Sequence, residues 1–311
     1  MYVGLHFAVS NGRNILTFVK YNLYGTNLGE NCLSMRKGIF FVIHISRVKL
    51  IVLIAILIFT FLFYTVIIKS SSNVVYQTNT FSNKPQLAII IDDFGQNQNG
   101  VKEMMEIDRH LTFAVMPFLE FSEQDAVEAH NRGFEVIVHL PMQSHVASKE
   151  KWLGPRPVHL ISSDEEIRNI VLDSINSIPY AVGVNIHMGC LASENERIMT
   201  SVMSAVKEKN LYFVDSRTSS KTVCREVAQK VGVQFAERNV FLEHSSKAKD
   251  YIKKQLSIAG DVAIKKGYAV AIGHVGAVSG NVTAEAIKEM IPELEEKGIE
   301  FIFVSELIYK R

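Results

Sequence analysis

The stretch LAIIIDDFG at residues 87–95 indicates the fold class of the chain. Its leading residues are apolar without a polar break, which is typical of a strand buried on both faces of a parallel sheet. Two adjacent carboxylates, Asp92 and Asp93, follow this run. Because two like charges are costly to bury side by side unless they share a cation or a proton, the pair points to a site at the end of the strand.

Seven more short apolar runs follow along the chain. They are LTFAVM (111–116), EVIVHL (135–140), VGVNIH (182–187), LYFVD (211–215), NVFLE (239–243), YAVAIGH (268–274) and EFIFVS (300–305). Between them, serines with capping-box spacing predict helix starts at Ser122, Ser163 and Ser193. Strands alternating with helices in this way predict an α/β fold, a distorted (β/α)7-8 barrel, with an open doubly wound sheet as the alternative.

Composition and motif content exclude two classes of partner. Residues 1–84 hold eight Lys/Arg and one Glu, whereas residues 85–311 hold 25 Lys/Arg and 31 Asp/Glu. This acidic region is unsuited to a nucleic-acid backbone, whose affinity for proteins comes from neutralisation by Lys and Arg. The segment IIIDDFGQNQNG at the first strand contains no glycine-rich phosphate loop, so no nucleotide cofactor is expected.

A membrane-spanning helix is predicted at residues 50–68. The segment LIVLIAILIFTFLFYTVII carries no charge, and its length of about 28 Å is close to the ~30 Å hydrocarbon core of a bilayer. Basic residues precede it at Arg36, Lys37, Arg47 and Lys49, and only Lys69 follows it closely. The positive-inside rule therefore predicts a cytoplasmic N-terminus and export of the rest to the periplasm or another extracytoplasmic space.

Four regions follow from this interpretation. Residues 1–49 form an N-terminal cytoplasmic segment, 50–68 a signal-anchor without a small-residue cleavage site, 69–84 a flexible Ser/Asn/Thr-rich linker, and 85–311 the exported domain. An export signal is already complete from Met35, because two basic residues and the apolar run follow it. We therefore expect residues 1–34 to be an extension upstream of the true start.

Polar side chains gather at the predicted carboxyl ends of the strands. They are Asp92, Asp93, His139, Asn185, His187, Asp215, Glu243, His244 and His274. In a barrel these strand ends surround one shared mouth, where active sites form. A carboxylate with two neutral imidazoles is a ligand set for Zn²⁺ or a similar divalent ion, and also for Fe(II). A second carboxylate beside the ligand favours a hydrolase, because it can take a proton from a metal-bound water.

A series of motifs occurs in order over residues 86–308: IIIDDFG, LTFAVMPF, EVIVHLPM, AVGVNIHMG, YFVDSRTS, RNVFLE, AIGH and FVSEL. In this order they resemble the divergent polysaccharide deacetylases, a branch of the NodB-like carbohydrate esterases (carbohydrate esterase family 4). The resemblance implies a distorted barrel of the NodB type and metal-dependent removal of acetyl groups from N-acetylated sugars.

The resemblance also implies roles for the residues at the strand ends. Asp92 matches the catalytic base, Asp93 the metal-binding aspartate and His139 the first metal histidine. The second metal histidine of the parent family follows the first by a few residues, where this chain has PMQ. His187 is the expected replacement, and His274 matches the general acid.

The chain departs from the family pattern at three places. The parent family's Arg-Pro-Pro-Tyr stretch, which orients the catalytic aspartate, is absent. Ile186 and Cys190 stand where the divergent branch usually has Asn and Ser, and Glu243 stands where it tends to have Asp. These changes leave the metal ligands in place and affect the contacts to substrate.

The leading interpretation is a membrane-anchored, metal-dependent hydrolase that deacetylates an N-acetylated polysaccharide or oligosaccharide of the cell envelope, with Zn²⁺ as the expected metal. Metal-activated water attacks the acetamide, Asp92 acts as the base, and His274 as the acid. Asn185, Asp215 and Arg217 are predicted to orient the site or the substrate. Asp215 either holds the imidazolium of His274 or forms a salt bridge with Arg217.

The alternative from another class is a non-catalytic envelope protein that binds glycan or a partner in the same mouth. The metal assignment itself makes a geometric prediction. Because metal–nitrogen distances are ~2.0–2.1 Å, the ligand atoms of Asp93, His139 and His187 should lie roughly 3–4 Å from one another. His145, in the long loop that follows the 135–140 run, is the reserve ligand.

Overall fold

The computed structural model describes residues 2–10, 13–21, 41–45, eight residues between 51 and 61, and the ranges 84–145, 151–276 and 280–309. The chain divides into two compact units, Met1–Thr80 and Phe81–Arg311. Each unit is described by itself.

The first unit contains a three-stranded antiparallel sheet. Strands β1 (Tyr2–Ser10) and β2 (Arg13–Tyr21) pair along their whole lengths, and β3 (Phe41–Ile45) pairs with β2. Within the described residues, no helix combines the length and apolarity needed for a membrane span. The predicted signal-anchor at 50–68 lies partly outside the described residues, and so does the predicted linker at 69–84 apart from Lys84.

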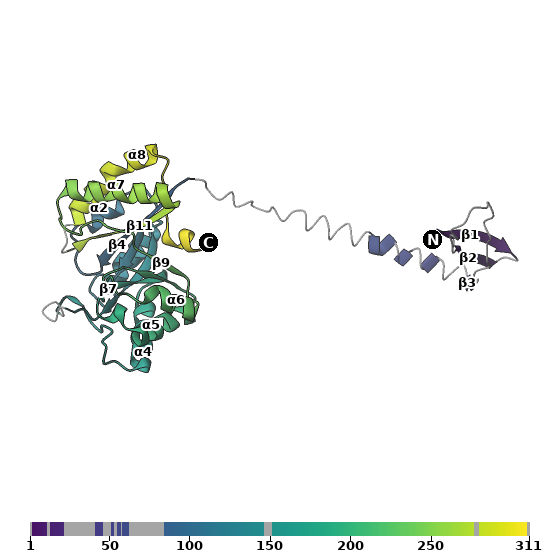
Figure 1. Ribbon diagram of the computed structural model, residues 1–311, viewed down its shortest axis with the longest axis horizontal. Helices are drawn as coiled ribbons and strands as arrows, with labels where there is room; N and C mark the ends of the chain where they lie inside the picture. Colours follow the sequence, from purple (N-terminus) through teal and green to yellow (C-terminus); the bar gives the residue numbers. More distant parts are fainter. Residues whose placement is uncertain are drawn as a thin grey trace, which may run out of the picture. The chain divides into compact units, whose positions relative to one another are not determined.

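The second unit is built on a parallel sheet with the strand order β10-β11-β4-β5-β6-β7-β8-β9. Figure 1 labels β4, β7, β9 and β11 of this sheet. The strands are β4 (Gln86–Phe94), β5 (Thr112–Val115), β6 (Glu135–Met142), β7 (Ala181–Met188), β8 (Tyr212–Asp215), β9 (Phe235–Glu237), β10 (Val240–Phe241) and β11 (Tyr268–His274). A further strand, β12 (Glu300–Ile302), pairs with the start of β4. A strand is found in every one of the eight predicted runs, whereas β9 was not predicted.

The sheet curls until its two ends reach the same short segment of chain. Strands β9 and β10 stand at opposite ends of the strand order, yet only two residues separate them in the chain. Strand β9 pairs with β8 through Phe235–Glu237, and β10 pairs with β11 through Val240–Phe241. The fold is therefore a curled, partly open parallel barrel, and the open doubly wound alternative is wrong.

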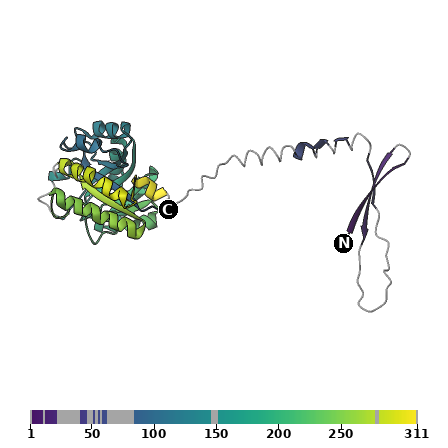
Figure 2. The same ribbon diagram turned by 90° about the horizontal axis from the view of Figure 1, so that it is seen from above.

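Helices cover the outside of this curled sheet. They are α2 (Val101–Met105), α3 (Ser122–Asn131), α4 (Asp164–Ser177), the 3₁₀ helix η2 (Ala192–Glu194), α5 (Glu196–Glu208), α6 (Cys224–Val231), α7 (Lys249–Lys266) and α8 (Gly280–Glu296), whereas α9 (Val304–Tyr309) packs into the barrel interior. Helices α7 and α8, drawn in green and yellow, run side by side over one flank, and α4, α5 and α6 cover the other (Figures 1 and 2).

Strand β4 lies between two apolar cores, which explains why the run at residues 87–91 contains no polar residue. Leu87, Ile89 and Ile91 pack into the large core between the sheet and the helices. Ala88 and Ile90 point the other way, into a smaller core inside the barrel. Strand β4 is thus buried on both faces, as a parallel strand covered by helices should be.

Helix α9 closes the barrel interior at the amino ends of the strands. Its Val304 and Leu307 belong to the inner core. The backbone N–H of Val304 donates to Thr112 Oγ1, and that of Ser305 donates to Glu135 Oε1, both at 3.3 Å. Thr112 and Glu135 thus accept the first N–H groups of α9, which have no partner within the helix. The run predicted as a strand over 300–305 therefore ends at Ile302, and a helix follows it.

Only one of the three predicted serine caps is confirmed. Ser163 Oγ accepts from the N–H of Glu166 and caps α4. Helix α5 is capped by Asn195 instead of Ser193. Ser122 is the first residue of α3, but its hydroxyl donates to the carbonyl of Met116. It therefore stabilises the preceding loop and does not cap the helix. Spacing alone cannot tell a cap from a loop contact.

Gly183 makes the closest approach between β7 and β8. It pairs with Tyr212, and a Cβ at this position would overlap the fully buried Tyr212 ring. Gly183→Ala should lower the free energy of unfolding by about 1–3 kcal/mol through overpacking. Gly260→Ala is the matched control, because its nearest atoms are methyl ends of Leu294 and Ile299 at 2.7 and 2.9 Å. Urea unfolding followed by circular dichroism measures both, and equal losses would contradict the tight contact at Gly183.

Candidate metal centre and active site

One cavity at the carboxyl end of the barrel collects the polar side chains of four strands. Strand β4 contributes Asp92 and Asp93, β6 His139, β7 His187 and β11 His274, and all five side chains line this cavity. They are also buried or nearly so, with His274 the most accessible. The predicted gathering of these residues in one mouth is present in the fold.

An irregularity in β4 lets two neighbouring carboxylates face the same cavity. In a regular strand, successive side chains point to opposite faces. Here the register toward β5 shifts between Ile91 and Phe94, and Asp93 has a φ of 70°. Positive φ is uncommon for a non-glycine residue and is often kept at functional sites. Gly95 continues the turn at a φ of 94°, and its N–H donates to Asp125 Oδ2 at 2.8 Å.

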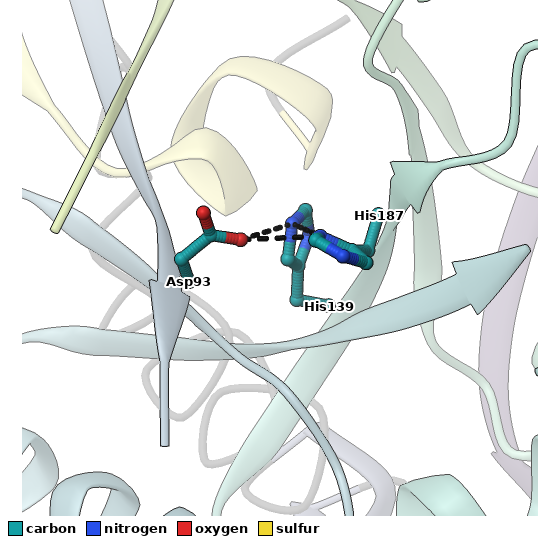
Figure 3. A group of neighbouring side chains, drawn as sticks. All are labelled: Asp93, His139 and His187. Carbon is teal, nitrogen blue, oxygen red and sulfur yellow. Dashed lines mark hydrogen bonds and ion pairs between the residues drawn. The ribbon is translucent and has the colours of Figure 1, made fainter. Parts of the chain in front are cut away.

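Three side chains converge on one point at the centre of the cavity (Figure 3). Asp93 Oδ1 lies 3.1 Å from His187 Nδ1 and 3.3 Å from His139 Nε2. The two ring nitrogens are 3.0 Å apart. These distances agree with the spacing predicted for the ligand atoms of one metal ion.

Hydrogen bonds on the far side of each ring assign the tautomers. Asn185 Nδ2 donates to Asp92 Oδ1 at 2.7 Å, so Asn185 Oδ1 is the acceptor for His139 Nδ1 at 2.6 Å. His187 Nε2 lies 3.0 Å from the carbonyl oxygen of Trp152, which can only accept. In their neutral forms, His139 therefore carries its proton on Nδ1 and His187 on Nε2.

The assigned tautomers leave three acceptor atoms facing one another. With both imidazoles neutral, none of His139 Nε2, His187 Nδ1 and Asp93 Oδ1 carries a proton. Asp93 Oδ1 is also a buried oxygen without a hydrogen-bond partner among the described residues. Two nitrogens and one carboxylate oxygen in this arrangement fit a divalent metal ion, with the far-side hydrogen bonds orienting the ligands.

The charges around the cluster attract a cation. Burial acts to raise the pKa of Asp93, but His139 and His187 outweigh it and hold this pKa well below its usual value. Burial acts to lower the pKa of His139, but Asp92 and Asp93 raise it overall. The cluster therefore favours positive charge, which a proton or a metal ion can supply.

Asp92 and His274 lie beside the cluster. Asp92 Oδ2 is 3.7 Å from His139 Nε2 and 4.0 Å from His274 Nε2. Burial raises the pKa of Asp92 above its usual value, while the histidines and Asn185 oppose the rise. A carboxylate with a raised pKa takes up a proton more readily near neutral pH.

Glu243 holds the imidazole of His274. Its Oε2 lies 3.1 Å from His274 Nδ1, and its Oε1 accepts from the N–H of His274 and from Thr283 Oγ1 at 3.1 and 2.7 Å. Burial acts to lower the pKa of His274, but Glu243 together with Asp93 and Asp92 raises it to about 9. The ring is therefore held as an imidazolium at neutral pH by the protein's own charges.

The structure corrects the contact predicted for Asp215. This buried carboxylate accepts from the N–H of Arg217 at 2.7 Å and from Thr222 Oγ1 at 3.0 Å, so it orders the turn after β8. Glu243 takes the place beside His274 that the sequence analysis gave to Asp215. The alternative salt bridge is also wrong, because Arg217 pairs with Glu237 at 3.5 Å.

The remaining candidates are Asn185, Arg217 and His145. Asn185 orients His139 and Asp92 from behind and does not line the cavity, whereas Arg217 does. The reserve ligand His145 is exposed, pairs with Glu194 at 3.2 Å and lies outside the cluster. Sequence reasoning gave no role to Arg238, which lines the cavity, although the RNVFLE motif contains it.

Comparisons with known proteins identify the family of the chain. The family model of divergent polysaccharide deacetylases matches residues 89–308. The chain is 35% identical to YibQ of Escherichia coli K12 over 211 residues, which is 67% of this chain and 64% of YibQ. It is 33% identical to an uncharacterized protein of Haemophilus influenzae Rd over 203 residues, 65% of this chain and 71% of the relative.

A solved structure supports the fold alone. A crystal structure of an uncharacterized protein from Agrobacterium tumefaciens C58 superposes with a TM-score of 0.67 at 18% identity, covering 72% of this chain and 89% of the other. The family match, by contrast, covers most of the chain and includes every residue that converges in the cavity. The chain belongs to the divergent polysaccharide deacetylases.

Proposed function

We propose that this protein is a metal-dependent deacetylase of an N-acetylated cell-envelope polysaccharide. The observation that supports it is the convergence of Asp93 Oδ1, His139 Nε2 and His187 Nδ1 beside two further titratable groups, Asp92 and His274. We also propose that residues 50–68 anchor the chain in a membrane with residues 85–311 exported. The uncharged apolar run and the basic residues before it support this part.

Asp93, His139 and His187 would hold the metal, which we propose to be Zn²⁺. Two imidazole nitrogens and one carboxylate oxygen leave a further position open on a four-coordinate ion. When bound, such an ion polarises a carbonyl oxygen and lowers the pKa of water to near 7. Asn185 and the Trp152 carbonyl keep the two rings in the tautomers that direct a lone pair toward the ion.

Asp92 is the proposed general base. Its Oδ1 is fixed by the amide of Asn185, and its Oδ2 is the atom nearer to His139 and His274. The pKa raised by burial brings the carboxylate closer to the working range of a base at neutral pH. In this role Asp92 accepts the proton that the attacking water gives up.

His274 is the proposed general acid. Its Nδ1 is held by Glu243, so Nε2 faces the cavity on the side of Asp92. Held as an imidazolium, the ring can donate the Nε2 proton to the amine that leaves when the acetamide C–N bond breaks. A carboxylate behind the imidazole, as Glu243 is here, stabilises the protonated form and fixes the ring orientation.

The activity test separates the ligand residues from the acid and the base. We expect the purified full chain with added Zn²⁺ to release acetate from N-acetylated oligosaccharides of the peptidoglycan or chitin type. Asp92→Asn and His274→Ala should each lower turnover by ~10²–10⁴ with unchanged metal content. Asp93→Asn should lose metal together with activity, because it removes a ligand.

Two results would contradict these assignments. Loss of metal in His274→Ala with full metal content in His187→Ala would reverse the roles of the two histidines. Wild-type protein that is folded and metal-loaded, but releases no acetate from any oligomer of the panel, would favour a non-catalytic glycan- or partner-binding protein.

The pH dependence tests the pairing of His274 with Glu243. Because the imidazolium is the active form of an acid with a pKa raised to about 9, activity should be retained below this pKa and lost as pH rises through it. Glu243→Gln removes the neighbouring negative charge, so the alkaline limb of kcat should move to lower pH.

The matched control is Glu237→Gln, which removes a carboxylate that pairs with Arg217 and Arg225 and does not touch His274. Its alkaline limb should stay at the wild-type pH. An unshifted limb in Glu243→Gln would show that this carboxylate does not set the protonation of the acid.

A further inference from the structure

We propose that the substrate is an anionic N-acetylated sugar, whose carboxylate or phosphate substituent binds Arg238 in the same cavity as the metal cluster. The inference rests on the proposed deacetylase function and narrows its substrate class. Three observations support it: the position of Arg238, the contacts that hold its guanidinium, and the absence of a direct ion pair to it within the described residues.

Arg238 is held rigidly at the break between β9 and β10. Its Nε donates to the carbonyl oxygen of Ser216 at 2.6 Å, and its Nη2 to that of Arg217 at 2.7 Å. The guanidinium also lies over the ring of Phe241, 5.0 Å from the ring centroid. These three contacts fix the orientation of the guanidinium, and none of them uses Nη1. The side chain lines the cavity.

Within the described residues, the guanidinium of Arg238 forms no direct ion pair with a carboxylate. Its neighbours differ in this respect, because Arg217 and Arg225 both pair with Glu237, at 3.5 and 2.6 Å. Arg238 is half-buried, and burial lowers its pKa although the charges of Asp215 and Asp92 oppose this shift. These two carboxylates offset part of the cost of burying the charge, and an anionic ligand in direct contact would offset more of it.

The location of Arg238 suits a substituent close to the reacting group. The guanidinium of Arg238 and the imidazole of His274 both contact the ring of Phe241, each at 5.0 Å from its centroid. The cation and the proposed proton donor therefore share one aromatic neighbour. Trp152, which is 53% exposed, also lines the cavity and offers an apolar face to a sugar ring.

The cavity is more basic than the domain as a whole. Residues 85–311 carry 31 Asp/Glu against 25 Lys/Arg, whereas Arg217 and Lys247 line the cavity together with Arg238. In the cavity, Arg238 adds positive charge to that of a bound divalent ion. The planar guanidinium matches the oxygens of a carboxylate or a phosphate, which a neutral chitin-type chain does not carry.

The test compares substrates that differ only in charge. The first pair is the disaccharide of N-acetylglucosamine and N-acetylmuramic acid with its lactyl carboxylate free, and the same disaccharide as the methyl ester. The second is a chitin-type tetramer with and without phosphate at O6. Because a hydrogen bond to a charged group contributes about 1.5–3 kcal/mol, the anionic member of one pair should have a kcat/KM about 10–100-fold higher. The pair that shows the preference identifies the anion.

Variants assign this preference to Arg238. Arg238→Gln should abolish the ratio of kcat/KM between the anionic and the neutral member, whatever its effect on activity overall, and Arg225→Gln, which removes a charge outside the cavity, should keep this ratio. If Arg238→Gln does not fold, Arg238→Lys keeps the charge but loses the fork, and should reduce the preference. Calorimetric Kd values on the full-length Asp92→Asn variant should follow the same order without turnover.

The failure of this inference differs from the failure of the proposed function. Equal kcat/KM and equal Kd within both pairs, with acetate released, would overturn anion recognition and leave the deacetylase intact. Tighter binding of the anionic member that depends on Arg238, without acetate release from any substrate, would support the anion site and contradict the deacetylase.

Discussion

The mutual repulsion of three acceptor atoms is the constraint on which this site depends. His139 Nε2, His187 Nδ1 and Asp93 Oδ1 lie 3.0–3.3 Å from one another, and no donor from the described residues reaches the carboxylate oxygen. Such an arrangement is stable only when positive charge enters it. The surrounding contacts preserve it, because Asn185 and the carbonyl of Trp152 occupy the far nitrogens of both rings.

The fold supplies this site through an irregular strand and through the strand order. The positive φ of Asp93 turns its carboxylate into the cavity that already holds Asp92, which a regular strand would not do. The strand order places β11 directly beside β4, where His274 pairs in register with Asp92. Proposed base and proposed acid thus stand on neighbouring strands, each fixed by a side chain behind it.

Much of this arrangement could be predicted from the sequence, because its signals are local. Unbroken apolar runs marked the strands, and parallel strands place their final polar residues at one edge, which was enough to group Asp92, Asp93, His139, His187 and His274. The partner of His274 could not be predicted this way. Glu243 and Asp215 both end apolar runs, and only the strand order, in which β10 pairs with β11 and β8 with β9, decides which of them adjoins His274. Arg238 lies in the RNVFLE motif, but an arginine in a short loop is ordinarily solvated, so the motif did not indicate a site residue.

The most direct test of the central claim is anomalous diffraction at the zinc edge from crystals of the Zn²⁺-loaded protein. We predict one ion per chain, bound by Asp93 Oδ, His139 Nε2 and His187 Nδ1 at about 2.0–2.2 Å, and absent from crystals of His187→Ala. An ion that takes His274 as a ligand, or a cavity that binds no divalent ion while the three side chains keep their places, would contradict the metal centre.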